Sequence, residues 1–89
     1  MLAGSREQRR SRRRQTRRAA ALSLRSDYPA VPCVICDLSD TGAKIAPALP
    51  PNNLPDYFIL RLADQVALNC RVVWRDARFV GVQFWVPKL

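Results

Sequence analysis

Hydrophobic and polar residues alternate in short runs over most of the chain after residue 20, and this pattern predicts β-strands. The runs cover residues 22–24, 31–37, 43–46, 57–62, 66–75 and 80–84. Polar turns separate most of them, including the residues 39–42 and 76–78. Four of the seven prolines fall within 47–55, which predicts an extended loop there. No part of this region shows the period of a helix.

Six short strands with one apolar face each predict an all-β protein, and a closed antiparallel barrel satisfies them best. A barrel buries one face of every strand and leaves no unpaired edges. We therefore predict a six-stranded antiparallel β-barrel over residues 21–89. Strand alternation places these side chains in its core: Leu24, Ile35, Ile45, Phe58, Leu60, Leu62, Leu68, Val72, Trp74, Val80, Val82 and Phe84. Trp85 has the opposite parity to Phe84 and is expected at the surface.

Charge divides the chain into two parts. Residues 1–25 contain nine arginines and a single acid, which accounts for the whole net charge of +8. The remainder is neutral overall. We predict a flexible Arg-rich arm over residues 1–20, because clustered like charges repel one another. Such an arm indicates an anionic partner, which can be a nucleotide, a nucleic acid or an acidic membrane surface.

The sequence predicts a cytoplasmic protein with reduced thiols. The apolar stretch at residues 19–24 is too short for a secretory signal, and no uncharged run approaches the length of a transmembrane segment. An Arg-rich mitochondrial transit peptide stays open as an alternative. The cysteines number three, so they cannot all pair within one chain. Cys33 and Cys36 are expected on opposite faces of one strand, away from each other.

Catalytic and metal chemistry find little support. At 89 residues the chain is one small domain, and it contains no histidine, the commonest general base and metal ligand. Ser39 lies near Asp37 and Asp40 but has no base to activate it. We therefore expect neither an enzyme nor a metal site nor a cofactor. Trp74 is interpreted as a core residue rather than a stacking surface.

Two motifs stand out from this background. Asp37, Ser39 and Gly42 form D-x-S-x-x-G at the turn after the second predicted strand, and residues 10–14 form R-x-x-x-R, a spacing that the arginines of residues 1–25 generate five times. Together they resemble the PilZ family, which binds the bacterial second messenger cyclic di-GMP. The resemblance extends to residues 54–58, 70–75 and 81–84, and covers roughly 9 to 86.

The resemblance implies a ligand site made of Arg10, Arg14, Asp37, Ser39 and Gly42. An arginine fork matches a phosphate or the O6/N7 edge of guanine, whereas a carboxylate accepts from the guanine N1–H and N2–H groups. Ser39 is expected to add a hydroxyl contact. Gly42 is expected either to adopt a turn conformation closed to other residues or to let the backbone approach the ligand. The additional Arg9 resembles the basic residue of members that bind a stacked ligand dimer.

The resemblance further implies that cyclic di-GMP orders the arm against the barrel and so changes the surface that a protein effector or a homodimer partner reads. Two other classes stay open. A basic-tailed nucleic-acid-binding barrel is less favoured, because few aromatic side chains are expected at the surface for stacking. A membrane-surface protein would use the arm on anionic lipid.

Overall fold

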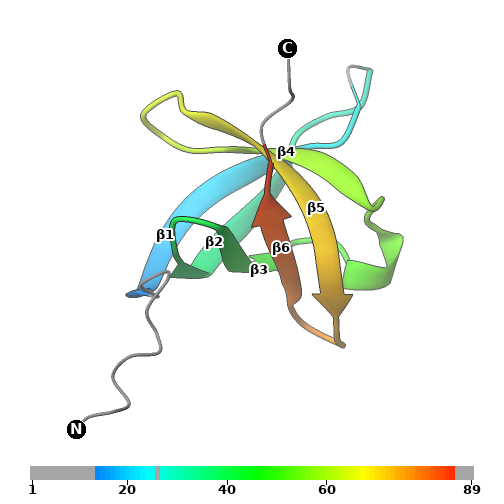
Figure 1. Cartoon of the computed structure of the whole chain (residues 1–89). Coiled ribbons are helices and arrows are strands. Elements are labelled where there is room, and N and C mark those ends of the chain that lie inside the picture. The colour runs from blue at the N-terminus through cyan, green and yellow to red at the C-terminus, as the bar shows by residue number, and fades with distance from the viewer. Residues whose placement is uncertain (1–13, 26, 86–89) are drawn as a thin grey trace, which may run out of the picture.

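A computed structural model describes residues 14–25 and 27–85 of the chain. Six antiparallel strands close into a barrel in the order β1-β2-β3-β6-β5-β4, which confirms the predicted all-β architecture (Figure 1). The strands and one 3-10 turn are β1 Arg14–Ser23, β2 Val31–Leu38, β3 Gly42–Pro47, η1 Pro51–Asn53, β4 Tyr57–Arg61, β5 Ala67–Arg75 and β6 Val80–Phe84. No helix in these ranges is long and apolar enough to cross a membrane.

β1 begins much earlier than the hydrophobic pattern predicts. It starts at Arg14 and therefore takes in residues 14–20, which the charge pattern places in the arm. Residues 1–13 of the predicted arm lie outside the described residues. The backbone of β1 pairs with β2 from Arg14 to Leu22, whereas β4 pairs only with residues 21–23. Tertiary pairing thus makes a strand from an Arg- and Ala-rich sequence of modest strand propensity.

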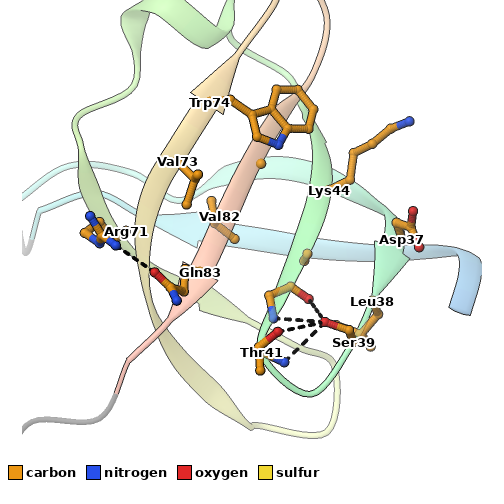
Figure 2. A pocket seen from close by; sticks show the side chains of 13 residues that line it. Asp37, Leu38, Ser39, Thr41, Lys44, Arg71, Val73, Trp74, Val82 and Gln83 are labelled. Atoms are coloured by element: carbon orange, nitrogen blue, oxygen red, sulfur yellow. Dashed lines mark hydrogen bonds between the residues drawn. The ribbon is translucent and has the colours of Figure 1, made fainter. Parts of the chain in front are cut away.

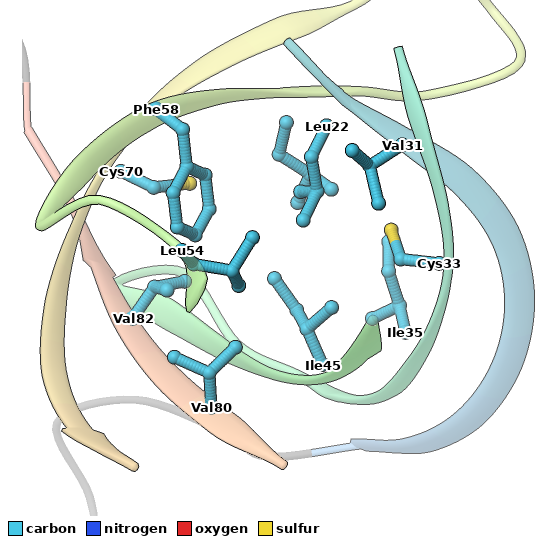
Figure 3. Packing of buried hydrophobic residues seen from close by; sticks show 11 residues of the cluster. Leu22, Val31, Cys33, Ile35, Ile45, Leu54, Phe58, Cys70, Val80 and Val82 are labelled. Atoms are coloured by element: carbon cyan, nitrogen blue, oxygen red, sulfur yellow. The ribbon is translucent and has the colours of Figure 1, made fainter. Parts of the chain in front are cut away.

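The core fills the barrel with small and branched apolar side chains. Leu22, Ile35, Ile45, Leu60 and Val80 are fully buried, and Figure 3 shows how side chains of the surrounding strands converge. Most predicted core residues are buried or packed against this cluster. The cluster also includes Cys33 and Cys70, which are free thiols, and Leu54 from the loop after η1.

Trp74 is not a core residue, and the prediction that it would be is wrong. The register of β5 against β6 shifts by one residue between Val72 and Trp74. The extra residue, Val73, forms a β-bulge, after which the inward and outward faces of the strand are exchanged. Trp74 consequently lies on the outer surface and is 44% exposed.

The same bulge turns Arg75 toward one end of the barrel, where strict alternation would have left it in solvent. Its Nη1 donates to the carbonyl oxygens of Pro51 at 2.7 Å and Leu54 at 2.8 Å, and its Nη2 contacts Asp56 at 2.6 Å. These bonds fix the η1 segment across the barrel end, where Leu54 enters the core. A single guanidinium therefore holds in place the segment that covers this end of the barrel.

Candidate functional site

A row of four side-chain positions crosses the outer face of the barrel on neighbouring strands. The register aligns Asp37 of β2 with Lys44 of β3, Lys44 with Gly81 of β6, and Gly81 with Trp74 of β5. A groove of about 330 Å³ follows this row and reaches the β2–β3 turn (Figure 2). It brings together all three residues of the D-x-S-x-x-G motif.

Trp74 forms one wall of the groove, and sequence alternation missed it. A Cβ atom on Gly81 would overlap the indole ring of Trp74, so the ring lies directly against the bare backbone of β6. Because Gly81 has no side chain, the indole ring can pack directly on the backbone at this position. A glycine facing a tryptophan across a hairpin is the sequence signal that could have indicated this arrangement.

Lys44 places a cation in the middle of the row. Its Nζ lies 4.6 Å from the centroid of the Phe79 ring, a cation–π contact that orients the ammonium group. Lys44 is the cross-strand neighbour of Asp37. The groove therefore offers a carboxylate acceptor and an ammonium donor on adjacent strands, a pairing that the sequence alone did not single out.

Asp37 reaches the outer face through a second bulge. Residues Val31, Cys33 and Ile35 alternate inward along β2, and strict alternation would bury Asp37 with them. The register of β2 against β3 shifts between Ile35 and Asp37, with Cys36 as the extra residue. The shift sets Asp37 opposite Lys44 and on the outside of the barrel.

Ser39 organises the turn that closes this end of the groove. Its Oγ accepts hydrogen bonds from the backbone N–H groups of Thr41 and Gly42, each at 3.2 Å, and lies 3.3 Å from the carbonyl oxygen of Gly42 (Figure 2). The Ser39 backbone N–H donates to the same carbonyl at 2.9 Å. In this structure the hydroxyl therefore serves the turn, a role that the sequence interpretation, which assigned it to the ligand, did not foresee.

Gly42 is required by strand packing. Its φ is not positive, so the expectation of a turn conformation closed to other residues is wrong. A Cβ atom at this position would overlap the backbone carbonyl oxygen of Val82. Gly42 thus permits a close approach between β3 and β6, and the backbone that comes close belongs to the protein itself.

Arg71 and Gln83 form the other rim of the groove. Arg71 Nη2 donates to Gln83 Oε1 at 2.7 Å, across neighbouring positions of β5 and β6. Both side chains are exposed. A polar group in the groove can therefore meet a guanidinium on this side and the Asp37 carboxylate on the other.

The start of β1 runs directly beside the motif on β2. The backbone of Arg14 pairs with that of Leu38, and Gln15 pairs with Asp37. Arg9 and Arg10 lie outside the described residues, and for Arg14 only the backbone is described. The register nevertheless fixes where the chain enters the fold: R-x-x-x-R leads into the strand next to D-x-S-x-x-G.

The buried thiols do not supply a nucleophile. Burial raises the pKa of Cys33 to about 11, with a smaller contribution from the neighbouring Cys36 thiol. Burial also raises the pKa of Cys70 to about 12, against a partly opposing backbone hydrogen bond at Leu60. Both thiols are therefore protonated at neutral pH and act as apolar core groups. Within the described ranges, no three His, Cys, Asp or Glu side chains gather into a metal site.

A small barrel with a polar groove on its outer face, flanked by the entry of an arginine-rich segment, defines a module suited to binding an anionic ligand. The family model of the PilZ domain matches residues 7–88, nearly the whole chain, and the chain belongs to this family. PilZ domains are a known cyclic di-GMP-binding family and are receptors rather than enzymes. No curated protein matches the chain.

Proposed function

We propose that this protein binds cyclic di-GMP in the groove between Asp37 and Trp74, with Arg10 and Arg14 as its principal cationic contacts. The observation that carries the proposal is the register of β1, which pairs the backbone of Arg14 with Leu38 and that of Gln15 with Asp37. The last residue of one motif thereby lies beside the other motif at one corner of the barrel.

The groove residues match the chemistry of a guanine nucleotide. The Asp37 carboxylate can accept from the N1–H and N2–H groups of guanine, whereas an arginine fork matches its O6/N7 edge or a phosphate. The exposed Trp74 indole provides a flat surface on which a base can stack. Lys44 supplies a compact positive charge for a phosphate oxygen.

The size of the groove indicates that the N-terminal segment takes part in the site. Its volume of about 330 Å³ is near the lower end of the range of small-molecule sites, roughly 300–1,000 Å³. A cyclic dinucleotide with two guanines and two phosphates is too large to be enclosed by a groove of this volume. Arg9, Arg10 and Arg14 would cover the part of the ligand that projects from the groove, with Arg9 available to a second, stacked ligand.

Signal transmission follows from the same arrangement. A ligand held by both the groove and the arginine segment links that segment to the barrel, and the linked state presents a different surface. A protein effector that binds only this surface would read the ligand, because a ligand shifts an equilibrium by its differential affinity for the two states. The protein itself needs no cofactor and no catalytic group for this role.

Calorimetric titration with cyclic di-GMP, beside GMP and cyclic di-AMP, tests the proposal. Asp37→Ala should weaken binding by about 1–3 kcal/mol, or roughly tenfold to a hundredfold in Kd. Asp40→Ala is the matched control, since Asp40 is an exposed acid in the same turn. Arg14→Ala should behave like Asp37→Ala, with Arg17→Ala as its control on the same strand.

Two results would contradict the proposal. Absence of heat with cyclic di-GMP from folded protein would remove the activity. Equal affinities of Asp37→Ala and Asp40→Ala for cyclic di-GMP would show that the groove carboxylate makes no specific contact with the ligand. Tight binding to RNA or DNA that falls steeply with salt would instead favour the nucleic-acid-binding alternative.

A further inference from the structure

A second groove, of about 310 Å³, lies on the outer face formed by β1, β4 and β5. Its floor follows another cross-strand row, in which Ser23 pairs with Ile59 and Ile59 with Asn69. Tyr57, Arg61 and Trp85 stand around that floor. None of these residues belongs to the D-x-S-x-x-G or R-x-x-x-R motifs, so the proposed ligand site leaves this groove unexplained.

Two exposed aromatic side chains shape the groove before any partner arrives. Tyr57 is 57% exposed and Trp85 is 42% exposed. Their ring centroids are 6.4 Å apart with an interplanar angle of 87°, an edge-to-face pair. Each ring restricts the other, so little side-chain freedom remains to be lost on binding. Tyrosine, tryptophan and arginine are the residues that most often dominate protein–protein interfaces.

The groove is positively charged. Arg61 Nε donates to Ser23 Oγ at 3.0 Å, which holds the guanidinium in place and leaves its two terminal nitrogens without another partner among the described residues. Arg25 adds a second cation, which among the described residues pairs with Asp27 at 3.6 Å in a solvent-exposed contact that contributes little. No described Asp or Glu lines the groove. These features favour a partner that carries carboxylates.

The two grooves adjoin each other at β5. Arg71, on the rim of the first groove, is the cross-strand neighbour of Tyr57, which lines the second. Gln83 lies on the same rim and bonds to Arg71 at 2.7 Å. A partner seated in the second groove therefore lies within reach of whatever occupies the first.

We propose that the second groove is a docking site for an extended acidic segment of the effector protein, with an aromatic or aliphatic side chain packed against the Tyr57–Trp85 pair. That the partner is an effector rests on the proposed function. Charge complementarity distinguishes this occupant from a second copy of the chain. An isologous dimer would place the same patch on both sides, so Arg25 and Arg61 would face their own counterparts.

The chain contains two tryptophans, one at each groove, and they separate the two events. We suggest labelling the full chain with 5-fluorotryptophan and following each fluorine resonance by NMR. The probe for the second groove is a short peptide of alternating Glu and Leu with one central Phe. Its counterpart with Lys in place of Glu is the control. The acidic peptide should shift the Trp85 resonance in a saturable, salt-sensitive manner, and the lysine peptide should not.

Matched variants locate the contact. Tyr57→Ala and Arg61→Glu should each weaken peptide binding by about tenfold or more, the effect expected of interface anchors. Tyr28→Ala and Arg78→Glu are their controls, because both residues are exposed and lie outside the groove. The unchanged Trp74 resonance reports that each variant is folded. If Arg61→Glu disturbs the fold, the Tyr57→Ala comparison still decides the outcome.

Several outcomes would overturn the inference. These are equal binding of the lysine peptide, a shift confined to Trp74, or no shift with the acidic peptide. A self-association that Tyr57→Ala abolishes would identify the occupant as a second copy. A loss of cyclic di-GMP affinity in Tyr57→Ala would make the groove part of the ligand site. A failure of the proposed function is distinguished by a different measurement: cyclic di-GMP would then leave the Trp74 fluorine resonance unshifted.

Discussion

Replacing Gly42 by alanine separates a packing role from a ligand-contact role for the last residue of the D-x-S-x-x-G motif. The added Cβ would overlap the backbone carbonyl oxygen of Val82, and that oxygen belongs to β6 and cannot rotate away. The two strands must therefore move apart where Gly42 pairs with Gln83. Because the Ser39 turn bonds to both the N–H and the carbonyl of Gly42, it is disturbed as well.

The size of the effect follows from what has to move. Overpacking a well-packed site costs about 1–3 kcal/mol, and a clash with backbone belongs in the upper half of that range. For a domain of this length each kcal/mol lowers Tm by about 4–8 °C. We therefore expect Gly42→Ala to lower Tm by roughly 10–20 °C, measured by circular dichroism or calorimetry without ligand.

Gly81→Ala is the matched control. Its Cβ would also overlap a neighbour, but that neighbour is the indole of the half-exposed Trp74, which can swing outward. The loss of stability should be less than about 1 kcal/mol, while the wall of the first groove is displaced. Gly81→Ala should therefore weaken cyclic di-GMP binding in a protein of nearly normal Tm. A Gly42→Ala protein with unchanged Tm would refute the packing argument.

Three further predictions concern stability and reactivity. Arg75→Met should destabilise the barrel by about 2–3 kcal/mol in urea unfolding, because it leaves the carbonyls of Pro51 and Leu54 without their donor. Asp56→Asn, at the exposed end of the same contact, should cost less than about 1 kcal/mol, and equal losses would contradict the assignment. Cys36 alone should react quickly with a thiol reagent near pH 8, since burial holds the pKa of Cys33 at about 11 and that of Cys70 at about 12; rapid modification of all three would argue against this core. Because these values are raised above the ordinary 9.0, the stability contributed by both thiols is fully present below pH 9 and should fall as pH rises toward 11–12, which unfolding at several alkaline pH values would show.

The alternation of apolar residues predicted the strands and most of the core, because a barrel buries one face of every strand. Ile35, Ile45 and Val80 lie where that pattern places them, at full burial. The start of β1 could not be predicted in the same way. Residues 14–20 are held by pairing with β2, a partner more than a dozen positions away, and no local apolar pattern marks them.

The motif predicted which residues lie together better than it predicted the structural role of each one. Asp37, Ser39 and Gly42 all line the first groove. In the structure, however, Ser39 bonds to the backbone of its own turn and Gly42 makes room for β6. A motif shows which residue type occurs at each position. From a single sequence, a residue that contacts a ligand cannot be distinguished from one that packing requires.

Two inserted residues explain why the groove could not be derived from alternation. Cys36 is an extra residue in β2 relative to β3, and Val73 is an extra residue in β5 relative to β6. After each bulge, the inward and outward faces of the strand are exchanged. Without them, Asp37 would follow Ile35 into the core and Trp74 would follow Val72. Burial of Asp37 is opposed by the cost of desolvating its carboxylate. Trp74 is favoured outside because its indole packs against the backbone of Gly81. A charged residue at an inward position, or a tryptophan opposite a glycine, therefore predicts a bulge, and here both bulges turn a side chain toward the same groove.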